Sequence, residues 1–162
     1  MLVDVESRAT HDDHLSVRVW LRLLTCTNIV EGRVAARLRD DFATTLPRFD
    51  FLSQLERVPG GLRMTDISKR MMVTGGNITA IADQLLAEGL ITRTPAPRDR
   101  RAAIVRLSAS GRRAFGEMAR AHEEWIVRMF AGLDERERTQ LYRLLAKLKG
   151  HLNAETPDER QR

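Results

Sequence analysis

The sequence predicts a mostly α-helical fold with one small β-hairpin. Aromatic residues make up only 5% of the chain, and a β-sandwich or barrel would use more aromatic and β-branched residues. Leu, Ala, Arg and Glu are abundant instead, and all four favour helices. Hydrophobic residues amount to 43% and charged residues to 30%, which is typical of a folded globular chain. The length of 162 residues suits a single domain over residues 1–162.

The first predicted helix covers residues 14–42. Its apolar residues recur at multiples of three or four positions, and Trp20 and Leu24 widen the stripe. A helix this long carries more apolar surface than one small domain can cover, so the pattern indicates a dimer. Cys26 lies mid-helix among apolar neighbours, and we expect it to be a buried small hydrophobe. The stripe consists of Leu15, Val19, Leu23, Val30, Val34, Leu38 and Phe42.

Two short helices are predicted next. Pro47 marks the first turn of one that runs to about residue 57, and Pro-Gly-Gly at residues 59–61 ends it. Thr65 is expected to cap another helix over residues 66–72, because a hydroxyl at this position accepts a hydrogen bond from a free backbone N–H.

The helix predicted over residues 75–88 has a face suited to DNA. Thr74 is expected to cap it, and Gly89 followed by Leu90 predicts a left-handed end. One face is apolar, and the other carries only small or hydrogen-bonding side chains, where an ordinary exposed face carries Glu and Lys. The apolar face comprises Ile78, Ile81, Ala82, Leu85 and Leu86, and the opposite face Gly75, Gly76, Asn77, Thr79, Ala80, Asp83 and Gln84.

A helix that enters the major groove needs such a face, because bulky side chains would hold it away from the base edges. Asn77 and Gln84 could pair with adenine. Thr79 and Ala80 could touch a phosphate or a thymine methyl group. The alternative is an ordinary solvated helix face.

A basic segment follows over residues 93–113 and includes a hairpin of two predicted strands, residues 91–94 and 103–107. Its only acid is Asp99, and a loop is expected around Pro95 and Pro97. A solvated surface usually mixes charges, whereas a one-signed loop between strands suits the negative potential of a DNA minor groove. Asp99 can hydrogen-bond the Arg101 guanidinium and orient it. The arginines are Arg93, Arg98, Arg100, Arg101, Arg106, Arg112 and Arg113.

Two further helices are predicted after the hairpin. Ser108 can cap a long helix that ends near Gly132. Asp134 and Glu137 then form a capping-box-like start to the last helix, and Gly150 is expected to end it.

Short helix, turn, helix and hairpin, in that order, form the layout of a winged helix-turn-helix. The segment over residues 47–107 is therefore predicted to be a DNA-binding lobe. Its sequence resembles the MarR family of bacterial regulators, whose wing carries an Asp-x-Arg motif, here Asp99 and Arg101. The matching segments are TTLPRFDFLSQLER, MTDISKRMMVTGGNITAIADQLLAEGLITR and DRRAAIVRLSASGRRAF.

The resemblance implies an obligate homodimer in which helices over residues 14–42 and 109–150 interlock. It also implies a pseudo-palindromic double-stranded operator, read by two recognition helices and two wings. On this basis the DNA-binding residues are expected to be Thr74, Gly76, Asn77, Thr79, Ala80, Gln84, Arg98, Asp99, Arg100 and Arg101.

A finer resemblance points to a class of effector. The segments LRLLTCTNIVEGRV, LPRFD and MVTGGNIT are similar to regulators of aromatic-acid degradation, including repressors that respond to p-coumaroyl-, feruloyl- or benzoyl-CoA. This implies a pocket for a small aromatic ligand or its CoA thioester, lying between the dimer helices and the DNA-binding lobe. An arginine beside aromatic rings could hold a carboxylate or a CoA phosphate. The expected lining is Trp20, Arg48, Phe49, Leu52 and Trp125, of which Trp20, Phe49 and Trp125 could instead be dimer core.

Other kinds of site find little support in the sequence. Cys26 is the only cysteine, so an internal disulfide or zinc knuckle is excluded. His11 and His14 flank two aspartates without a cysteine partner, and His122 and Glu123 do not share a helix face, so no metal site is expected. No catalytic set or phosphate-binding loop is found, so we expect neither an enzyme nor a cofactor.

The net charge of +5 is compatible with nucleic-acid binding and is weak support for it by itself. No apolar run reaches the roughly 18 residues of a membrane span, and no signal-peptide pattern is found, so the chain is expected to be cytoplasmic. Two alternatives stay open. One is a redox-sensing repressor that uses Cys26, and the other is a winged-helix module that binds protein.

Overall fold

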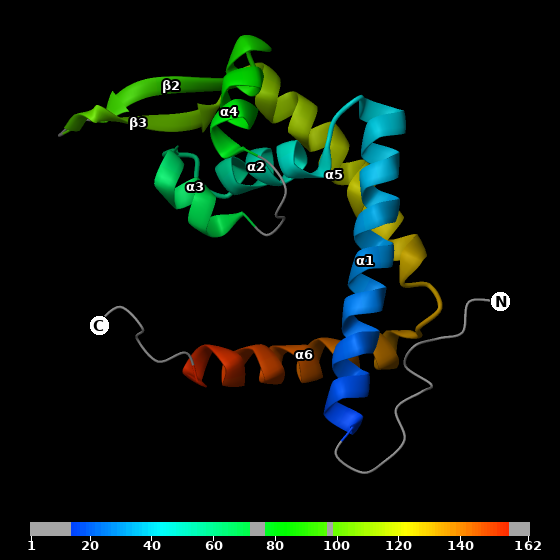
Figure 1. Cartoon of the computed structure of the whole chain (residues 1–162). Coiled ribbons are helices and arrows are strands. Elements are labelled where there is room, and N and C mark those ends of the chain that lie inside the picture. Colours follow the sequence, from blue (N-terminus) through cyan, green and yellow to red (C-terminus); the bar gives the residue numbers. More distant parts are fainter. Residues whose placement is uncertain (1–13, 72–76, 97–98, 156–162) are drawn as a thin grey trace. The chain divides into compact units, whose positions relative to one another are not determined.

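The computed structural model describes residues 14–71, 77–96 and 99–155, apart from the side chains of residues 99–101 and 155 (Figure 1). The chain divides into two compact units, residues 1–123 and residues 124–162. The first unit contains the whole segment predicted as the DNA-binding lobe. The second contains the end of one long helix and the helix that follows it.

The first helix, α1, spans Leu15–Phe42, within one residue of the prediction. Of its long apolar stripe only Val34 and Leu38 are buried. Trp20 is 58% exposed, and the stripe around it is likewise largely uncovered in the protomer. The helix ends where Ala43 adopts a left-handed conformation with φ 49°, and the Ala43 N–H returns to carbonyls of the last turn.

Helix α2, Leu46–Glu56, forms the centre of the core. Thr45 caps it by accepting a hydrogen bond from the Arg48 N–H at 3.4 Å, and Pro47 lies in its first turn. Its side chains pack on every side because the other elements of the first unit surround it. The fully buried residues of this unit include Phe51, Leu52 and Leu55 of α2, together with Ile67, Leu85, Ile91 and Val105.

Helix α3, Met64–Arg70, begins earlier than the sequence suggested. Thr65 lies inside the helix and is not its cap, so that prediction was wrong. Strand β1, Leu62–Arg63, pairs with a later strand, and the chain turns from this strand directly into the helix. Arg63, still extended, takes the cap position without a side-chain hydrogen bond.

Helix α4, Ile78–Ala87, is shorter than predicted. Its cap is Asn77 and not Thr74, because Asn77 is extended and its side-chain oxygen accepts hydrogen bonds from the Thr79 and Ala80 N–H groups at 3.1 and 3.3 Å. Leu86 was expected in the core but is 39% exposed.

The end of α4 confirms the predicted left-handed stop. Gly89 has φ 71°, its N–H donates to the Leu86 carbonyl at 3.0 Å, and the Leu90 N–H donates to the Leu85 carbonyl at 2.9 Å. This pair of bonds is the Schellman motif.

Strands β2, Ile91–Ala96, and β3, Asp99–Leu107, are longer than predicted. They form an antiparallel sheet in the order β1-β3-β2, with Ile91 opposite Leu107 and an irregularity after Pro95. Pro95 was expected in a loop but lies in β2, which an edge strand tolerates because one of its sides needs no N–H donors. Figure 1 shows the β2–β3 hairpin projecting beyond α2 and α3.

Helix α5, Ala109–Met129, and helix α6, Glu135–Glu155, start as predicted. Ser108 accepts a hydrogen bond from the Gly111 N–H at 2.9 Å. Asp134 and Glu137 exchange two hydrogen bonds of 2.8 Å in a capping box. Gly150 does not end α6, since one glycine inside a helix costs only about 1 kcal/mol relative to alanine. No helix among the described residues is long and apolar enough to cross a membrane.

Candidate nucleic-acid interface and effector cavity

The outer face of α4 carries the predicted small and polar side chains. Thr79, Ala80 and Gln84 are exposed, while Ile81 and Leu85 of the same helix are buried. Because the buried face anchors α4 to the core, the exposed face is presented as a unit that could lie in a major groove.

Asn77 has a structural role that the sequence analysis did not assign to it. Its side-chain oxygen is held by two backbone N–H groups at the start of α4. Pairing with adenine through both ends of the amide needs this oxygen as an acceptor, so a capping Asn77 keeps only its NH2 group for a partner. Thr74 and Gly76 lie outside the described residues.

Three arginines of the basic segment are engaged within the protomer. Arg93 pairs with Asp83 of α4 at 3.0 Å, so Asp83 is neutralised on the otherwise uncharged helix face. Arg112 pairs with Glu56 of α2 at 2.9 Å. The Arg106 guanidinium donates to the Thr94 hydroxyl across the hairpin at 2.7 Å.

Asp83 and Glu56 lie outside the basic segment in the sequence. The sequence therefore suggested more uncompensated positive charge in this segment than the structure shows. Within the described part of the segment, Arg93 and Arg112 are compensated by acids of other elements. The side chains of Arg98, Asp99, Arg100 and Arg101, and the expected hydrogen bond from Arg101 to Asp99, lie outside the described residues.

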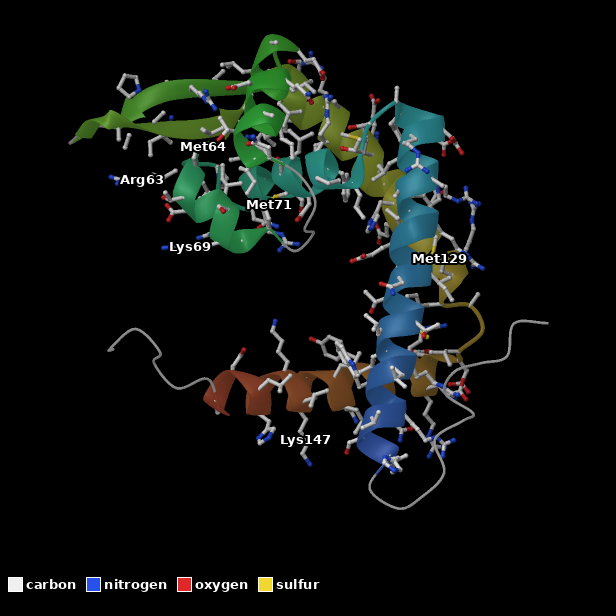
Figure 2. The ribbon with its side chains drawn as sticks, in the orientation of Figure 1. Arg63, Met64, Lys69, Met71, Met129 and Lys147 are labelled. Carbon is white, nitrogen blue, oxygen red and sulfur yellow. The ribbon has the colours of Figure 1, made fainter. Side chains whose placement is uncertain are left out.

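A second group of cations was missed by the sequence analysis. Arg63, Lys69 and Arg70 are exposed at the two ends of α3. Figure 2 shows the Arg63 and Lys69 side chains pointing away from the body of the ribbon on the same side. The first helix of a helix-turn-helix crosses the DNA backbone, so these cations stand where phosphates would pass. The adjacent Lys69 and Arg70 at the end of the short helix were the sequence signal that could have revealed this group.

A cavity of about 360 Å³ lies inside the first unit. It is bounded by the end of α1, the first turns of α2, the end of α4 and the middle of α5. Of the five residues predicted to bind an effector, Arg48 and Leu52 line it, and Trp20, Phe49 and Trp125 do not. The lining is Phe42, Ala43, Thr44, Arg48, Leu52, Leu85, Glu88, Leu90, Ala114, Glu117 and Met118.

Arg48, Glu88 and Glu117 are the charged residues in the wall of this cavity. Its guanidinium donates to a carboxylate oxygen of Glu88, the residue that caps the end of α4. The Arg48 side chain is 16% exposed and that of Glu88 46%. The Nε of Arg48 is buried and meets no hydrogen-bond acceptor among the described residues.

The remaining predicted aromatic residues occupy other places. Phe49 is buried between α2 and α5, with ring centroids 5.4 Å from Phe115 and 5.0 Å from His122. Burial in this contact lowers the pKa of His122 below its ordinary value of 6.5. Trp20 stands exposed on α1, and Trp125 is buried in the second unit.

Comparison with known proteins agrees with this geometry. Residues 44–102 match the MarR family. Sco3205 of Streptomyces coelicolor, a MarR family transcriptional regulator solved in complex with DNA, superposes with a TM-score of 0.75 at 19% identity, covering 94% of each chain. Residues 44–102 thus carry a winged helix-turn-helix that matches the MarR family.

Two curated relatives illustrate the range of this family. The transcriptional repressor MdtR of Bacillus subtilis is 32% identical over 102 residues, which cover 63% of this chain and 64% of MdtR. The transcriptional activatory protein BadR of Rhodopseudomonas palustris is 26% identical over 119 residues, which cover 72% of this chain and 67% of BadR. MarR-family proteins bind DNA operators, typically as dimers.

One expectation for this chain was wrong. Cys26 is exposed in the protomer and is not a buried small hydrophobe. It lies in a part of α1, residues 24–29, whose side chains are all exposed. Among the residues that the structure describes, no group of three or more His, Cys, Asp or Glu side chains could hold a metal ion. His11 lies outside those residues.

Proposed function

We propose that this MarR-family regulator is a homodimeric repressor of a catabolic operon for aromatic acids, released from its operator by a small aromatic ligand or its CoA thioester. The observation that carries the proposal is the cavity that has the half-buried side chain of Arg48 and the end of α4 in its wall. A ligand in this cavity contacts the helix that would read DNA.

In this proposal α4 reads the major groove and the hairpin reaches the minor groove. Thr79, Ala80 and Gln84 face the bases, and the NH2 group of Asn77 lies at the entry of the helix. Arg101, oriented by Asp99, enters the minor groove. The DNA backbone is contacted by residues that precede α4 or join the two strands of the hairpin, namely Thr74, Gly76, Arg98 and Arg100.

The exposed apolar stripe of α1 supports the homodimer. Val19 and Leu24 are 49% and 39% exposed, and a lone protomer would leave this stripe in water. In the proposed dimer the helices over residues 14–42 and 109–150 interlock and place two α4 helices on half-sites about one helical turn apart. The effector shifts the population toward lobe spacings that do not match the two half-sites.

The DNA-binding assignment is tested with a duplex selected by the protein from a random-sequence pool. Arg101→Ala is expected to weaken binding to this duplex, measured by fluorescence anisotropy, because it removes the cation from the minor groove. Arg136→Ala changes an exposed arginine of α6 in the same way and should leave binding unchanged. Equal binding by both variants would show that Arg101 does not contribute to binding of the duplex.

Salt separates DNA binding from the protein-interaction alternative. Affinity for duplex DNA must fall steeply as the salt concentration rises, because bound phosphates release counterions. A winged-helix module that binds only protein would show no such affinity.

The effector assignment is tested with p-coumarate, ferulate, benzoate and their CoA thioesters. At least one of these should weaken binding to the selected duplex, while light scattering still shows a dimer. Binding unchanged by the whole series would refute an aromatic effector.

The exposure of Cys26 favours one alternative, a redox-sensing repressor. An accessible thiol can be oxidised to a sulfenic acid, and peroxide would then release the DNA. Cys26→Ser abolishes this response if the alternative holds. In the aromatic-effector proposal the same variant responds to its ligand like the unmodified protein.

A further inference from the structure

We propose that Asp83 of α4 reads a cytosine in each half-site of the operator, and that Arg93 of β2 holds and neutralises its carboxylate for this contact. The inference rests on the proposed function, because it takes the outer face of α4 to lie in the major groove. It goes beyond that function by adding a base contact, by assigning one base of the operator and by giving Arg93 a positioning role.

Asp83 shares the outer face of α4 with side chains that are expected to meet the bases. It lies three residues after Ala80 and four after Thr79, a spacing that places side chains on one face of a helix. All three residues are exposed, and the Asp83 side chain is 59% exposed. Four residues advance a helix by about 6 Å, and base pairs lie about 3.4 Å apart. Asp83 therefore faces a base pair about two steps from that of Thr79.

Arg93 occupies a strand position that usually holds an apolar residue. Its partner across the hairpin is Val105, which is fully buried, and directly opposed residues of an antiparallel pair lie on the same face of the sheet. Thr92 and Thr94, on either side of Arg93, are exposed. Arg93 thus lies on the buried face of the sheet and reaches Asp83 from there, with 3.0 Å between its Nη1 and a carboxylate oxygen.

Stability alone does not account for this arrangement. Exposed ion pairs contribute little to folding. The Nε of Arg93 is buried and meets no hydrogen-bond acceptor among the described residues, which costs free energy.

The same arrangement suits a surface that meets DNA. An unpaired carboxylate on the outer face of α4 would be repelled by the phosphates. Paired with Arg93, Asp83 adds no net charge to this face. Because the Arg93 side chain is only 29% exposed, the surrounding protein holds it in place, and it fixes the carboxylate in turn.

The chemistry of a carboxylate at this position selects cytosine. An ionised carboxylate only accepts hydrogen bonds, and the donors in the major groove are cytosine N4 and adenine N6. Adenine also presents the acceptor N7 beside its donor, which repels a carboxylate, whereas cytosine itself presents no acceptor there. Guanine and thymine present acceptors, so Asp83 disfavours both.

The first test is selection from a random-sequence DNA pool by the unmodified protein, Asp83→Ala and Asp83→Asn. The unmodified protein should select cytosine at one position of each half-site. Asp83→Ala should lose this preference and keep the others, and Asp83→Asn should prefer adenine there, because an amide pairs with adenine. Replacing this cytosine in the selected duplex should weaken binding of the unmodified protein about fivefold or more, and binding of Asp83→Ala little.

Asp40→Asn is the matched control for the selection. Asp40 is an exposed aspartate of α1, so this variant removes the same charge outside the helix-turn-helix and should select the same sequences as the unmodified protein. An unchanged preference at every position in Asp83→Ala would overturn the proposal. Loss of preference at every position would overturn it as well, because Asp83 would then orient α4 as a whole.

The second test asks whether Arg93 acts through Asp83. Arg93→Met leaves the carboxylate without its cation and should weaken binding to the selected duplex about tenfold, within the range of coupling between contacting residues. Arg93→Lys keeps the charge and should retain most of the affinity. Adding Asp83→Asn to Arg93→Met removes the charge that needs a cation, so the double variant should regain most of the loss on the duplex that Asp83→Asn selects.

This rescue separates a positioning role of Arg93 from other roles. An arginine that only stabilises the fold, or that itself contacts a phosphate, gives no rescue. Thermal unfolding verifies that each variant is folded. A double variant that binds as weakly as Arg93→Met would overturn the proposed role of Arg93.

The two proposals fail separately. If the unmodified protein enriches no duplex from the pool, the proposed function itself is refuted. If it enriches a duplex and the Asp83 variants enrich the same one, the proposed function stands and only the cytosine contact is refuted.

Discussion

Lys69 is a single residue that can be tested for contact with DNA phosphates. It is exposed near the end of α3 and points outward in Figure 2. A plot of log affinity against log salt concentration has a negative slope. Lys69→Ala should make this slope less steep by about 0.9, the contribution of one phosphate contact. Binding should weaken about equally for all duplex sequences, because a phosphate carries no base identity.

Lys147→Ala is the control for this measurement. Lys147 is also exposed but belongs to α6 and not to the helix-turn-helix, and its loss should leave the salt slope unchanged. Equal slopes for Lys69→Ala and the unmodified protein would place α3 away from the DNA backbone.

Asn77 shows where residue-level prediction from sequence stops. Thr74 and Asn77 are both good helix caps, and the sequence alone does not decide between them. The choice depends on where the α3–α4 turn ends, which packing of Ile81 and Leu85 against the core fixes. The polar face of α4 was nevertheless predicted correctly, because helical spacing is a local property.

At the scale of elements, one close approach fixes the start of α5. A Cβ placed on Gly111 would lie 1.8 Å from the Leu90 carbonyl oxygen, whereas a Cβ on Gly116 of the same helix meets nothing within 4 Å. Gly111→Ala should therefore destabilise the protein by about 1–3 kcal/mol or more, as overpacking does. Gly116→Ala should stabilise it by up to about 1 kcal/mol through helix propensity.

Urea unfolding of the two glycine variants measures both effects. They share a helix and a chemical change, so they differ only in the space around the added methyl group. If both variants unfold at the same urea concentration, the α5 start does not pack against Leu90 as described.

The contact of α2 with α5 should make stability depend on pH. Burial lowers the pKa of His122 below 6.5, so the folded state favours the neutral ring that stacks on Phe49. Stability from this group is complete above the unfolded pKa and is lost as the pH falls through the lowered folded pKa. His122→Phe keeps an aromatic ring and should remove this loss.

The measurement is urea unfolding of the unmodified protein and His122→Phe between pH 5 and pH 8, a range chosen to bracket the ordinary His pKa of about 6.5. The difference in unfolding free energy should be flat at the upper end and change toward the acidic end. A constant difference across the range would mean that His122 is not buried when folded.

The helix ends that depend on neighbouring residues were predicted well from the sequence. The ion pairs that join one element to another were not. Ser108, the Asp134 capping box and Gly89 each act within a few residues of themselves, so the sequence was sufficient to place them. The pair of Arg93 with Asp83 joins two elements, and only the folded chain brings them together. The Arg48–Glu88 pair, with 40 residues between its members, was out of reach for the same reason.

At the scale of the whole molecule, the uncovered stripe of α1 was predictable and its role in assembly can be measured. Leu24 is 39% exposed in the protomer, and the next residue, Thr25, is exposed on an adjacent face. In a symmetric dimer the same surface serves both copies, so each substitution acts twice. Leu24→Asp would bury two unpaired carboxylates, at a cost of several kcal/mol each.

Light scattering at micromolar concentrations should therefore show a monomer for Leu24→Asp and a dimer for Thr25→Asp, which adds the same charge outside the stripe. The monomer should also bind the selected duplex far more weakly, because one lobe reaches only one half-site and loses the gain from linking two sites. A monomer that still binds the two-half-site duplex at full strength would show that each lobe reads DNA alone. In that case an effector could not act through the spacing of the two lobes, and release would have to arise within each lobe, at the end of α4.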